Sequence, residues 1–277
     1  MPDDAESVSR DTVAPAADRS PELSPPPLVP REIWTWRDLL LFIAFLPFAL
    51  LVAKLLVLVG YAVLRPLMGW HAKADAAQLD TLFLLVEQCV LYGLVLGFLV
   101  LLAGLFHRQP FWRSLGWHKL ASSQVMAFVA GGIALALGSS IILWLLPDTQ
   151  SFPLEQLFNS RAASIALSVF AVTFAPVMEE VVFRGLVFAV VERSLGWRWA
   201  TVISAGLFAS LHVPEYWRAW HHLMLIFLVG LVFSLARGLT GNLAPSIILH
   251  IGYNSVIVLS LFLSTQHFRQ MGSFCLK

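Results

Sequence analysis

The chain has few charged residues for its length. Asp, Glu, Lys and Arg make up only 13% of its 277 residues, whereas soluble domains average about 25%. The formal net charge is +1, and this argues against a basic, nucleic-acid-binding surface. The two cysteines, Cys89 and Cys275, lie far apart, and Cys89 falls inside an apolar segment, so a structural disulfide is not expected. A soluble fold and a nucleic-acid partner are both disfavoured.

Long apolar runs dominate the chain instead, with hydrophobic residues at 58%. A run of about 20 apolar residues is enough to cross a bilayer. Three such runs lie in the first half, at 39–64, 82–106 and 125–146. Lys54 and Glu87 are the lone charges of the first two runs, and a structural pair and a functional role both stay open for them. These runs predict ordinary membrane helices.

The apolar runs of the second half are less regular. Residues 165–191 are long enough to span but carry charges, and 243–264 is of full length but contains a histidine and an asparagine. The runs at 200–211 and 223–236 are short, since about 12 residues give only about 18 Å of helix. Short helices at membrane depth are tolerated where protein or a water-filled cavity covers them. The sequence therefore predicts an all-α, polytopic membrane bundle of seven or eight transmembrane helices around a polar intramembrane cavity.

The composition changes along the chain suggest three regions. Residues 1–30 are polar and Pro-rich, which predicts a disordered tail. N-terminal membrane helices are expected over 31–147 and a catalytic membrane core over 160–265, where the unusual polar residues concentrate. More Lys and Arg flank the inner ends of the spans if the N-terminus is cytoplasmic, so we expect that orientation.

The stretch FAPVMEEVVFRG, residues 174–185, places three charges in an apolar segment. Glu180 and Arg184 are four residues apart, so on a helix they share a face and can pair. Glu179 points about 100° away and needs another partner, such as a histidine, a water molecule or a metal.

Candidate partners occur in the later segments. Phe208 and His212 are four residues apart, and so are His250 and Asn254. Three such pairs in the last part of an apolar chain indicate a buried polar site rather than isolated structural contacts.

These pairs carry a resemblance to a known family. EEVVFR (179–184), FASLH (208–212) and HIGYN (250–254) follow the patterns EExxxR, FxxxH and HxxxN. Their order and spacing resemble the CPBP family of intramembrane proteases, which includes the type II CAAX prenyl endopeptidases and the bacterial Abi and bacteriocin-processing proteins. The resemblance covers about residues 160–265.

The resemblance implies peptide hydrolysis by an activated water, without an acyl-enzyme. It implies that Glu179 is the general base and that His212 holds the same water. His250 and Asn254 resemble the pair that stabilises the oxyanion. The residues implied to support the site are Glu180, Arg184 and Phe208.

The need for a metal is left open by the residues. No HExxH motif is present, and a glutamate–histidine water site accounts for the pattern without a metal, so we expect no cofactor. Zinc is the alternative, with Glu179, His212 and His250 as ligands.

The expected partners are the lipid bilayer and a membrane-associated protein or peptide substrate, either CAAX-like and prenylated or of bacteriocin type. The expected location is a bacterial cytoplasmic membrane; nothing indicates the oligomeric state. One alternative is a proton-coupled transporter, because buried Glu and His side chains also relay protons. Such a transporter would show inverted repeats, and the first half has no counterpart of these motifs. The other alternative is a non-proteolytic scaffold or immunity protein on the same fold.

Overall fold

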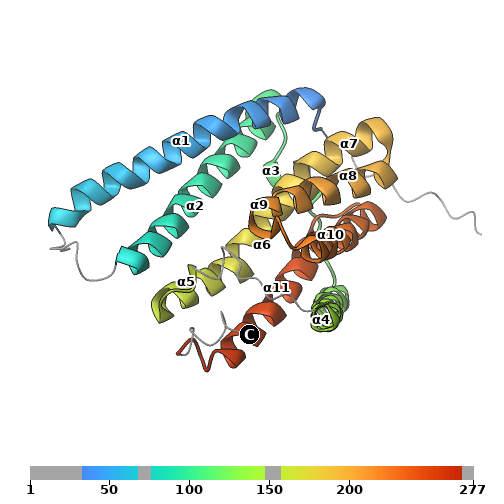
Figure 1. Cartoon of the computed structure of the whole chain (residues 1–277). Coiled ribbons are helices and arrows are strands. Elements are labelled where there is room, and N and C mark those ends of the chain that lie inside the picture. Colours follow the sequence, from blue (N-terminus) through green and yellow to red (C-terminus); the bar gives the residue numbers. More distant parts are fainter. Residues whose placement is uncertain (1–32, 68–75, 147–156, 270–277) are drawn as a thin grey trace, which may run out of the picture. The chain divides into compact units, whose positions relative to one another are not determined.

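The computed structural model of the chain describes residues 33–67, 76–146 and 157–269, and the regular structure in these ranges is helical (Figure 1). The expected tail at 1–30 and Cys275 lie outside the described residues. The elements are α1 (Trp36–Leu67), α2 (Ala76–Leu101), the π-helical segment η1 (Leu102–Phe106), α3 (Phe111–Ser114), α4 (Ser122–Leu145), α5 (Arg161–Val172), α6 (Phe174–Glu180), the π-helical segment η3 (Val181–Val187), α7 (Phe188–Leu195), α8 (Trp197–Ser210), α9 (Val213–Tyr216), α10 (Trp220–Thr240) and α11 (Ala244–Ser264).

Long apolar helices confirm a polytopic integral membrane protein with an all-α bundle. Within the described ranges, six stretches are long and apolar enough to cross a membrane, and they are Trp36–Leu64, Thr81–Phe106, Ser122–Leu145, Arg161–Leu195, Trp220–Thr240 and Ala244–Ser264. Seven or eight had been expected. The difference arises at α8, whose 14 residues give about 21 Å of helix against a core of about 30 Å.

The sequence prediction of a short helix at 223–236 is wrong. That segment belongs to α10, which runs for 21 residues from Trp220 to Thr240. Arg237 directly follows that run, but its side chain is buried within α10, and its Nε donates to the Arg184 carbonyl at 3.1 Å. Because this carbonyl accepts a hydrogen bond from the buried guanidinium group, the charged residue can stay within the helix.

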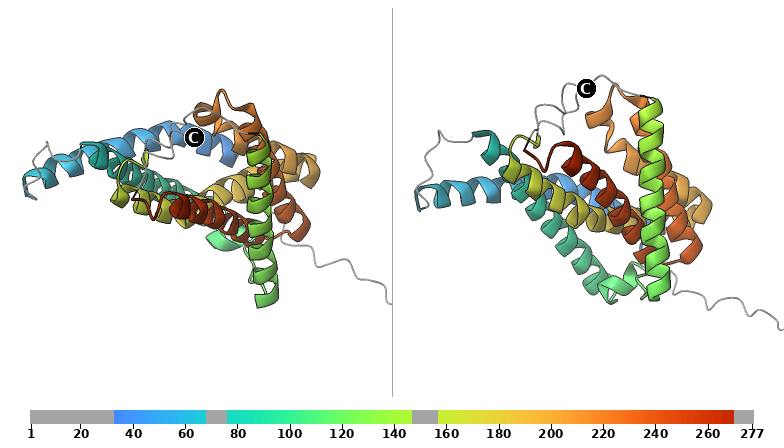
Figure 2. Two further views of the ribbon diagram at one scale, coloured as in Figure 1. Left: turned by 60° about the horizontal axis from the view of Figure 1, so that its bottom comes forward. Right: turned by 90° about the horizontal axis from the view of Figure 1, so that it is seen from below.

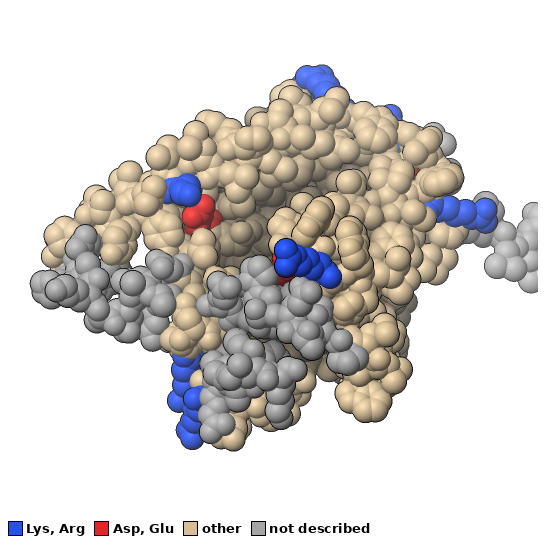
Figure 3. All heavy atoms as spheres, in the orientation of Figure 1, with Lys and Arg blue, Asp and Glu red and all other residues tan. Residues whose placement is uncertain are grey.

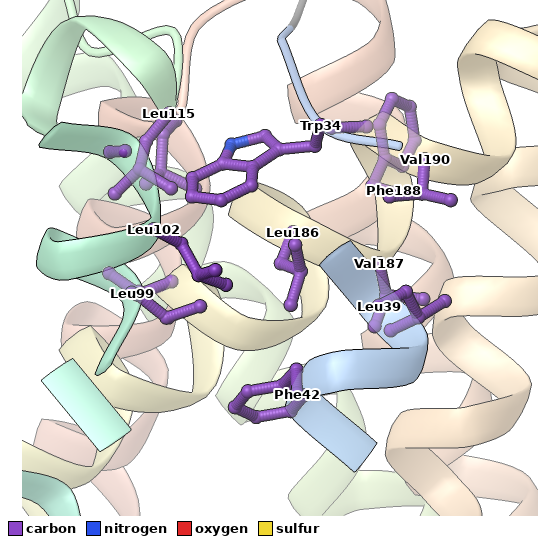
Figure 4. Packing of buried hydrophobic residues seen from close by; sticks show 14 of the residues in the cluster. Trp34, Leu39, Phe42, Leu99, Leu102, Leu115, Leu186, Val187, Phe188 and Val190 are labelled. Carbon is purple, nitrogen blue, oxygen red and sulfur yellow. The ribbon is translucent and has the colours of Figure 1, made fainter. Parts of the chain in front are cut away.

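An apolar cluster packs η3 and α7 against the first two helices, α1 and α2, which lie side by side (Figure 1). Trp34 is fully buried, and its indole nitrogen donates to the Ser114 carbonyl at 2.9 Å. Around it pack side chains from α1, from the end of α2, from η3 and from α7 (Figure 4). Leu186 and Val187 of η3 belong to this cluster, so packing holds the position of the π-helical segment.

Helices α4 and α11 cross each other closely, as both views in Figure 2 show. A Cβ at Gly132 would lie 2.4 Å from the Leu249 carbonyl oxygen, and one at Gly252 would lie 3.1 Å from the Val129 carbonyl oxygen. Glycine at both positions permits the contact, as small residues do between membrane helices. A groove of about 380 Å³ runs beside this contact. Its lining is apolar, so it is not the polar cavity expected from the sequence.

Candidate active site

The two glutamates lie where the fourth membrane-crossing stretch changes its helical form. The helix is interrupted at Thr173, three residues before Pro176, and α6 then ends with Glu179 and Glu180. From Val181 to Val187 the backbone is π-helical. Segments of π-helix are uncommon and occur frequently at functional sites. Glu179 and Glu180 therefore end an α-helix directly before the π-helical segment, and Arg184 lies within that segment, a change of backbone that the sequence did not reveal.

Two side chains from other helices bind carbonyl oxygens of the π-helical segment. Ser204 on α8 donates its hydroxyl to the Phe183 carbonyl at 2.8 Å, and both residues are buried. Arg237 on α10 donates to the Arg184 carbonyl. Buried backbone carbonyls need such donors, so α8 and α10 stabilise the irregular geometry.

Arg184 is fully buried and uses its whole guanidinium group. Nη1 donates to Glu180 Oε1 at 3.0 Å, Nη2 to the Gly230 carbonyl at 2.9 Å, and Nε to the Ser234 hydroxyl at 3.1 Å. The guanidinium carbon also lies 4.8 Å from the centre of the Phe208 ring, within the range of a cation–π interaction. The ion pair that the spacing of Glu180 and Arg184 predicts is present, and it is anchored on α10 as well.

Glu180 has a second partner that the sequence interpretation did not give it. Its Oε1 lies 2.8 Å from Nδ1 of His250, which comes from α11. Because an ionised carboxylate only accepts hydrogen bonds, Nδ1 carries the proton in this contact. The other oxygen, Oε2, is buried and has no hydrogen-bond partner among the described residues. Glu180 therefore connects the arginine of the scaffold to His250.

Glu179 remains partly accessible, with 26% of its side chain exposed, whereas Glu180 has none exposed. Its Oε2 lies 3.7 Å from Nε2 of His250. The imidazole thus lies between the two carboxylates, with Nδ1 toward Glu180 and Nε2 toward Glu179. The face of the protein that is drawn in Figure 3 is hollowed between α2 and α9, in front of the place that α6 occupies in Figure 1.

His212 follows the end of α8, and its Nδ1 lies 3.1 Å from the Phe208 carbonyl. A carbonyl only accepts, so Nδ1 donates here and Nε2 is left as the acceptor of a neutral ring. Burial lowers the pKa of His212 below its ordinary value of 6.5, the hydrogen bond to Phe208 raises it, and the charge of nearby His250 lowers it. The Phe208 ring centre lies 5.0 Å from that of His212 and 5.9 Å from that of His250, so Phe208 contacts both histidines.

Asn254 lies one turn beyond His250 on α11, but its contact is with a different helix. The side-chain amide donates to the Ala171 carbonyl on α5 at 2.8 Å. The spacing of four residues places His250 and Asn254 on one face of α11, but in the structure His250 contacts Glu180 and Asn254 contacts α5. The structure therefore brings together Glu179, Glu180, Arg184, Phe208, His212 and His250, with Asn254 at the edge of this group.

The alternative zinc set does not form a ligand group. In the described ranges no three His, Cys, Asp or Glu side chains are arranged so that they could hold a metal ion. The arrangement of Glu179, His212 and His250 does not fit zinc.

Two further charged residues, Lys54 and Glu87, lie on α1 and α2. Lys54 is exposed on α1, and it makes no ion pair with Glu87, although the structure describes both side chains and their helices lie side by side. The structural pair, one of the two roles left open for these residues, is therefore not formed as an ion pair. The Lys54 ammonium group and the Glu87 carboxylate do not contact each other.

Three buried residues that hydrogen-bond to Arg184 or to the π-helical backbone were not predicted from the sequence. Ser204, Ser234 and Arg237 are fully or almost fully buried. A small hydroxyl in a membrane helix is common and gives no signal by itself. Arg237 follows the apolar run at 223–236 and was not predicted to take part in the site.

Comparison with known families agrees with the motif spacing. Residues 161–256 match the family described as "Rce1-like: Type II CAAX prenyl endopeptidase Rce1-like". The matched segment contains the three motifs and the helices α5 to α10 with the first half of α11. No curated protein and no solved structure matches the chain. The resemblance of this segment to the CAAX protease family, inferred from the motifs, is confirmed.

Proposed function

We propose that the protein is an intramembrane endopeptidase that hydrolyses a peptide bond with a water molecule activated by Glu179. The observation that carries the proposal is the position of Glu179: a partly exposed carboxylate whose Oε2 lies 3.7 Å from Nε2 of His250. It stands in a segment that matches a protease family. A carboxylate held beside an imidazole, with access from outside, is suited to take a proton from water.

In the proposed reaction Glu179 accepts a proton from the water as the water oxygen attacks the peptide carbonyl carbon. The carbonyl oxygen becomes the oxyanion of a tetrahedral intermediate. The same proton then passes from Glu179 to the leaving amine as the carbon–nitrogen bond breaks. His212, whose Nε2 is an acceptor, holds the attacking water, and burial keeps this ring neutral by lowering its pKa.

We assign stabilisation of the oxyanion to His250 and Asn254. Glu180 accepts a hydrogen bond from Nδ1 of His250 and orients the ring, so that Nε2 faces the space next to Glu179. Nε2 donates to the oxyanion in the imidazolium form of His250, in which both ring nitrogens carry a proton. Asn254 uses one amide hydrogen for the Ala171 carbonyl, and its second amide hydrogen is the donor in this proposal. Donors fixed in advance at such a position lower the barrier because they need no reorganisation.

The proposed substrate is a membrane-associated protein or peptide, either CAAX-like and prenylated or of bacteriocin type. The proposed location is a bacterial cytoplasmic membrane with the N-terminus in the cytoplasm. No metal takes part in the proposed reaction, because the candidate ligands do not form a ligand group.

The test compares purified protein in lipid nanodiscs with its Glu179→Gln variant. The substrates are a farnesylated peptide ending in a CAAX sequence and its unprenylated form, and mass spectrometry detects the released C-terminal fragment. General acid–base catalysis contributes roughly 100- to 10,000-fold, so Glu179→Gln should reduce kcat at least about 100-fold. The matched control is Glu87→Gln, which changes a half-buried glutamate of another membrane helix and should retain activity. Equal cleavage by the protein and Glu179→Gln would refute the role of Glu179.

A further inference from the structure

One turn of α10 lies against the buried side of the candidate active site. Gly230, Phe233 and Ser234 are separated by three and four residues, so they share one face of this helix, and all three are buried. Gly230 and Ser234 accept hydrogen bonds from Arg184. Phe233 belongs to the same face, but the proposed reaction does not use it.

The ring of Phe233 stacks on the imidazole of His250. The two ring centres are 4.7 Å apart, and the ring planes differ by 29°. This distance lies in the range of offset-stacked aromatic pairs, which attract each other beyond the burial of their surface. Phe233 is fully buried and His250 almost fully buried, so water does not compete for the contact.

The other contacts of His250 need this stack to define the plane of its ring. The hydrogen bond from Nδ1 to Glu180 Oε1 holds one atom, and the imidazole can still turn about that bond. Phe208 meets the imidazole at 89°, with 5.9 Å between ring centres. A ring stacked on one face and a perpendicular ring together limit the turning. Nε2 is thereby held 3.7 Å from Glu179 Oε2.

The backbone of Phe233 is connected to α11 as well. Ser246 of α11 donates its hydroxyl to the Phe233 carbonyl at 2.8 Å, and both residues are fully buried. Ser246 precedes His250 by four residues, so the two share a face of α11. The Tyr253 ring lies edge-on to the Phe233 ring at 6.3 Å. Phe233 therefore contacts α11 before, at and after His250, and it helps to set the rotation of α11 against α10.

We infer that Phe233 is a positioning residue for His250: its ring fixes the imidazole plane so that Nε2 points to the space beside Glu179. Without the ring, the imidazole turns about its Nδ1 hydrogen bond. Because Phe233 is fully buried, its side chain does not contact the substrate. Its loss should therefore slow the chemical step without weakening substrate binding. This role rests on the proposed function, in which His250 stabilises the oxyanion.

The first experiment measures the kinetics of Phe233→Leu in nanodiscs with the farnesylated peptide. Leucine keeps an apolar side chain in the core but removes the aromatic ring. Misplacing a reacting group by about 1 Å can cost about 100-fold in rate, so kcat should fall about 10- to 100-fold while KM changes less than about twofold.

The second experiment follows the imidazole by NMR and needs no substrate. The protein carries isotope-labelled histidine, and the proton signal on Cε1 of His250 is assigned by its loss in His250→Gln. The current of an aromatic ring shields protons that lie over its face. The His250 signal of the unmodified protein should therefore lie upfield of the signal of exposed His118, and Phe233→Leu should move it downfield.

Phe42→Leu is the matched control. Phe42 is a buried phenylalanine of α1 in the apolar cluster (Figure 4), so the same side-chain atoms are removed far from the imidazole in the sequence. This variant should lose thermal stability, while its kcat and its His250 signal stay unchanged. Equal effects of the two leucine variants on kcat, or a His250 signal that Phe233→Leu does not move, would overturn the inference. If Phe233→Leu fails to fold, the unmodified protein decides, because a His250 signal without an upfield shift would contradict the stack.

The two readouts separate this role from the proposed function. If Glu179→Gln leaves cleavage unchanged while Phe233→Leu moves the His250 signal, the proposed function fails and the positioning of His250 by Phe233 stands. If Glu179→Gln abolishes cleavage while Phe233→Leu changes neither kcat nor the His250 signal, only the positioning role fails.

Discussion

Replacing Arg184 with methionine removes the cation from a fully buried ion pair and keeps most of the side-chain volume. Three acceptors lose the hydrogen bond from Arg184, namely Glu180 Oε1, the Gly230 carbonyl and the Ser234 hydroxyl, and Glu180 Oε1 keeps only the bond from His250 Nδ1. Breaking a buried pair on one side costs about 3–5 kcal/mol, because the remaining charge is left in a medium of low polarity. We expect Arg184→Met to lower the free energy of unfolding by that amount.

Two further variants separate charge from geometry. Arg184→Lys keeps the charge but cannot reach all three acceptors at once, and losing two hydrogen bonds at about 1 kcal/mol each should cost about 2 kcal/mol. The double variant Glu180→Met/Arg184→Met removes both charges. It should be more stable than the sum of its single variants predicts by about 1–3 kcal/mol, because no uncompensated charge remains.

Unfolding in mixed micelles of dodecyl maltoside and SDS, followed by tryptophan fluorescence, measures these differences. Arg198→Met is the control, because Arg198 is exposed and lies on the ring of Trp197, so its loss should cost less than about 0.5 kcal/mol. Strict additivity in the double variant, or equal stability of Arg184→Met and Arg198→Met, would show that Arg184 does not stabilise Glu180.

Three other predictions concern packing, pH and metal. Gly132→Ala should destabilise the protein by about 1–3 kcal/mol, since its Cβ would lie 2.4 Å from the Leu249 carbonyl, while Gly138→Ala, with no neighbour within 4 Å, should be neutral in the same SDS titration. Burial lowers the pKa of His212 in the folded protein, so below about pH 6.5 the unfolded chain binds a proton that the folded protein does not. The free energy of unfolding should therefore decrease as the pH drops below about 6.5. His212→Asn should make this decrease smaller. Dialysis against EDTA should leave cleavage of the farnesylated peptide unchanged, and loss of activity that stoichiometric zinc restores would contradict the metal-free reaction.

The membrane class of the fold and the pairing of Glu180 with Arg184 could be predicted because each depends on local information. Long apolar runs are enough to identify spanning helices, and a spacing of four residues is enough to place two side chains on one helical face. The length of α10 could not be predicted. A charge such as Arg237 ends a helix or stays within it according to whether another helix offers an acceptor.

The details of the site depend on contacts between distant segments, and these leave no pattern in the sequence. Nothing in the residues 181–187 distinguishes a π-helical from an α-helical backbone. The choice between Glu179 and Glu180 as the partner of His250 Nδ1 depends on how α11 is rotated against α6, which packing determines. The same rotation places Asn254 against Ala171 rather than beside His250.

The long sequence separations within the buried charge network have a consequence for how the protein is made. Arg184 binds groups 46 and 50 residues further along the chain, and Glu180 binds one 70 residues further along. During synthesis the stretch with these charges emerges first, and each such charge disfavours transfer into lipid by about 2.5–3.5 kcal/mol. The nascent chain is therefore expected to wait in the insertion machinery until α10 and α11 have been made, and to enter the bilayer together with them as one unit.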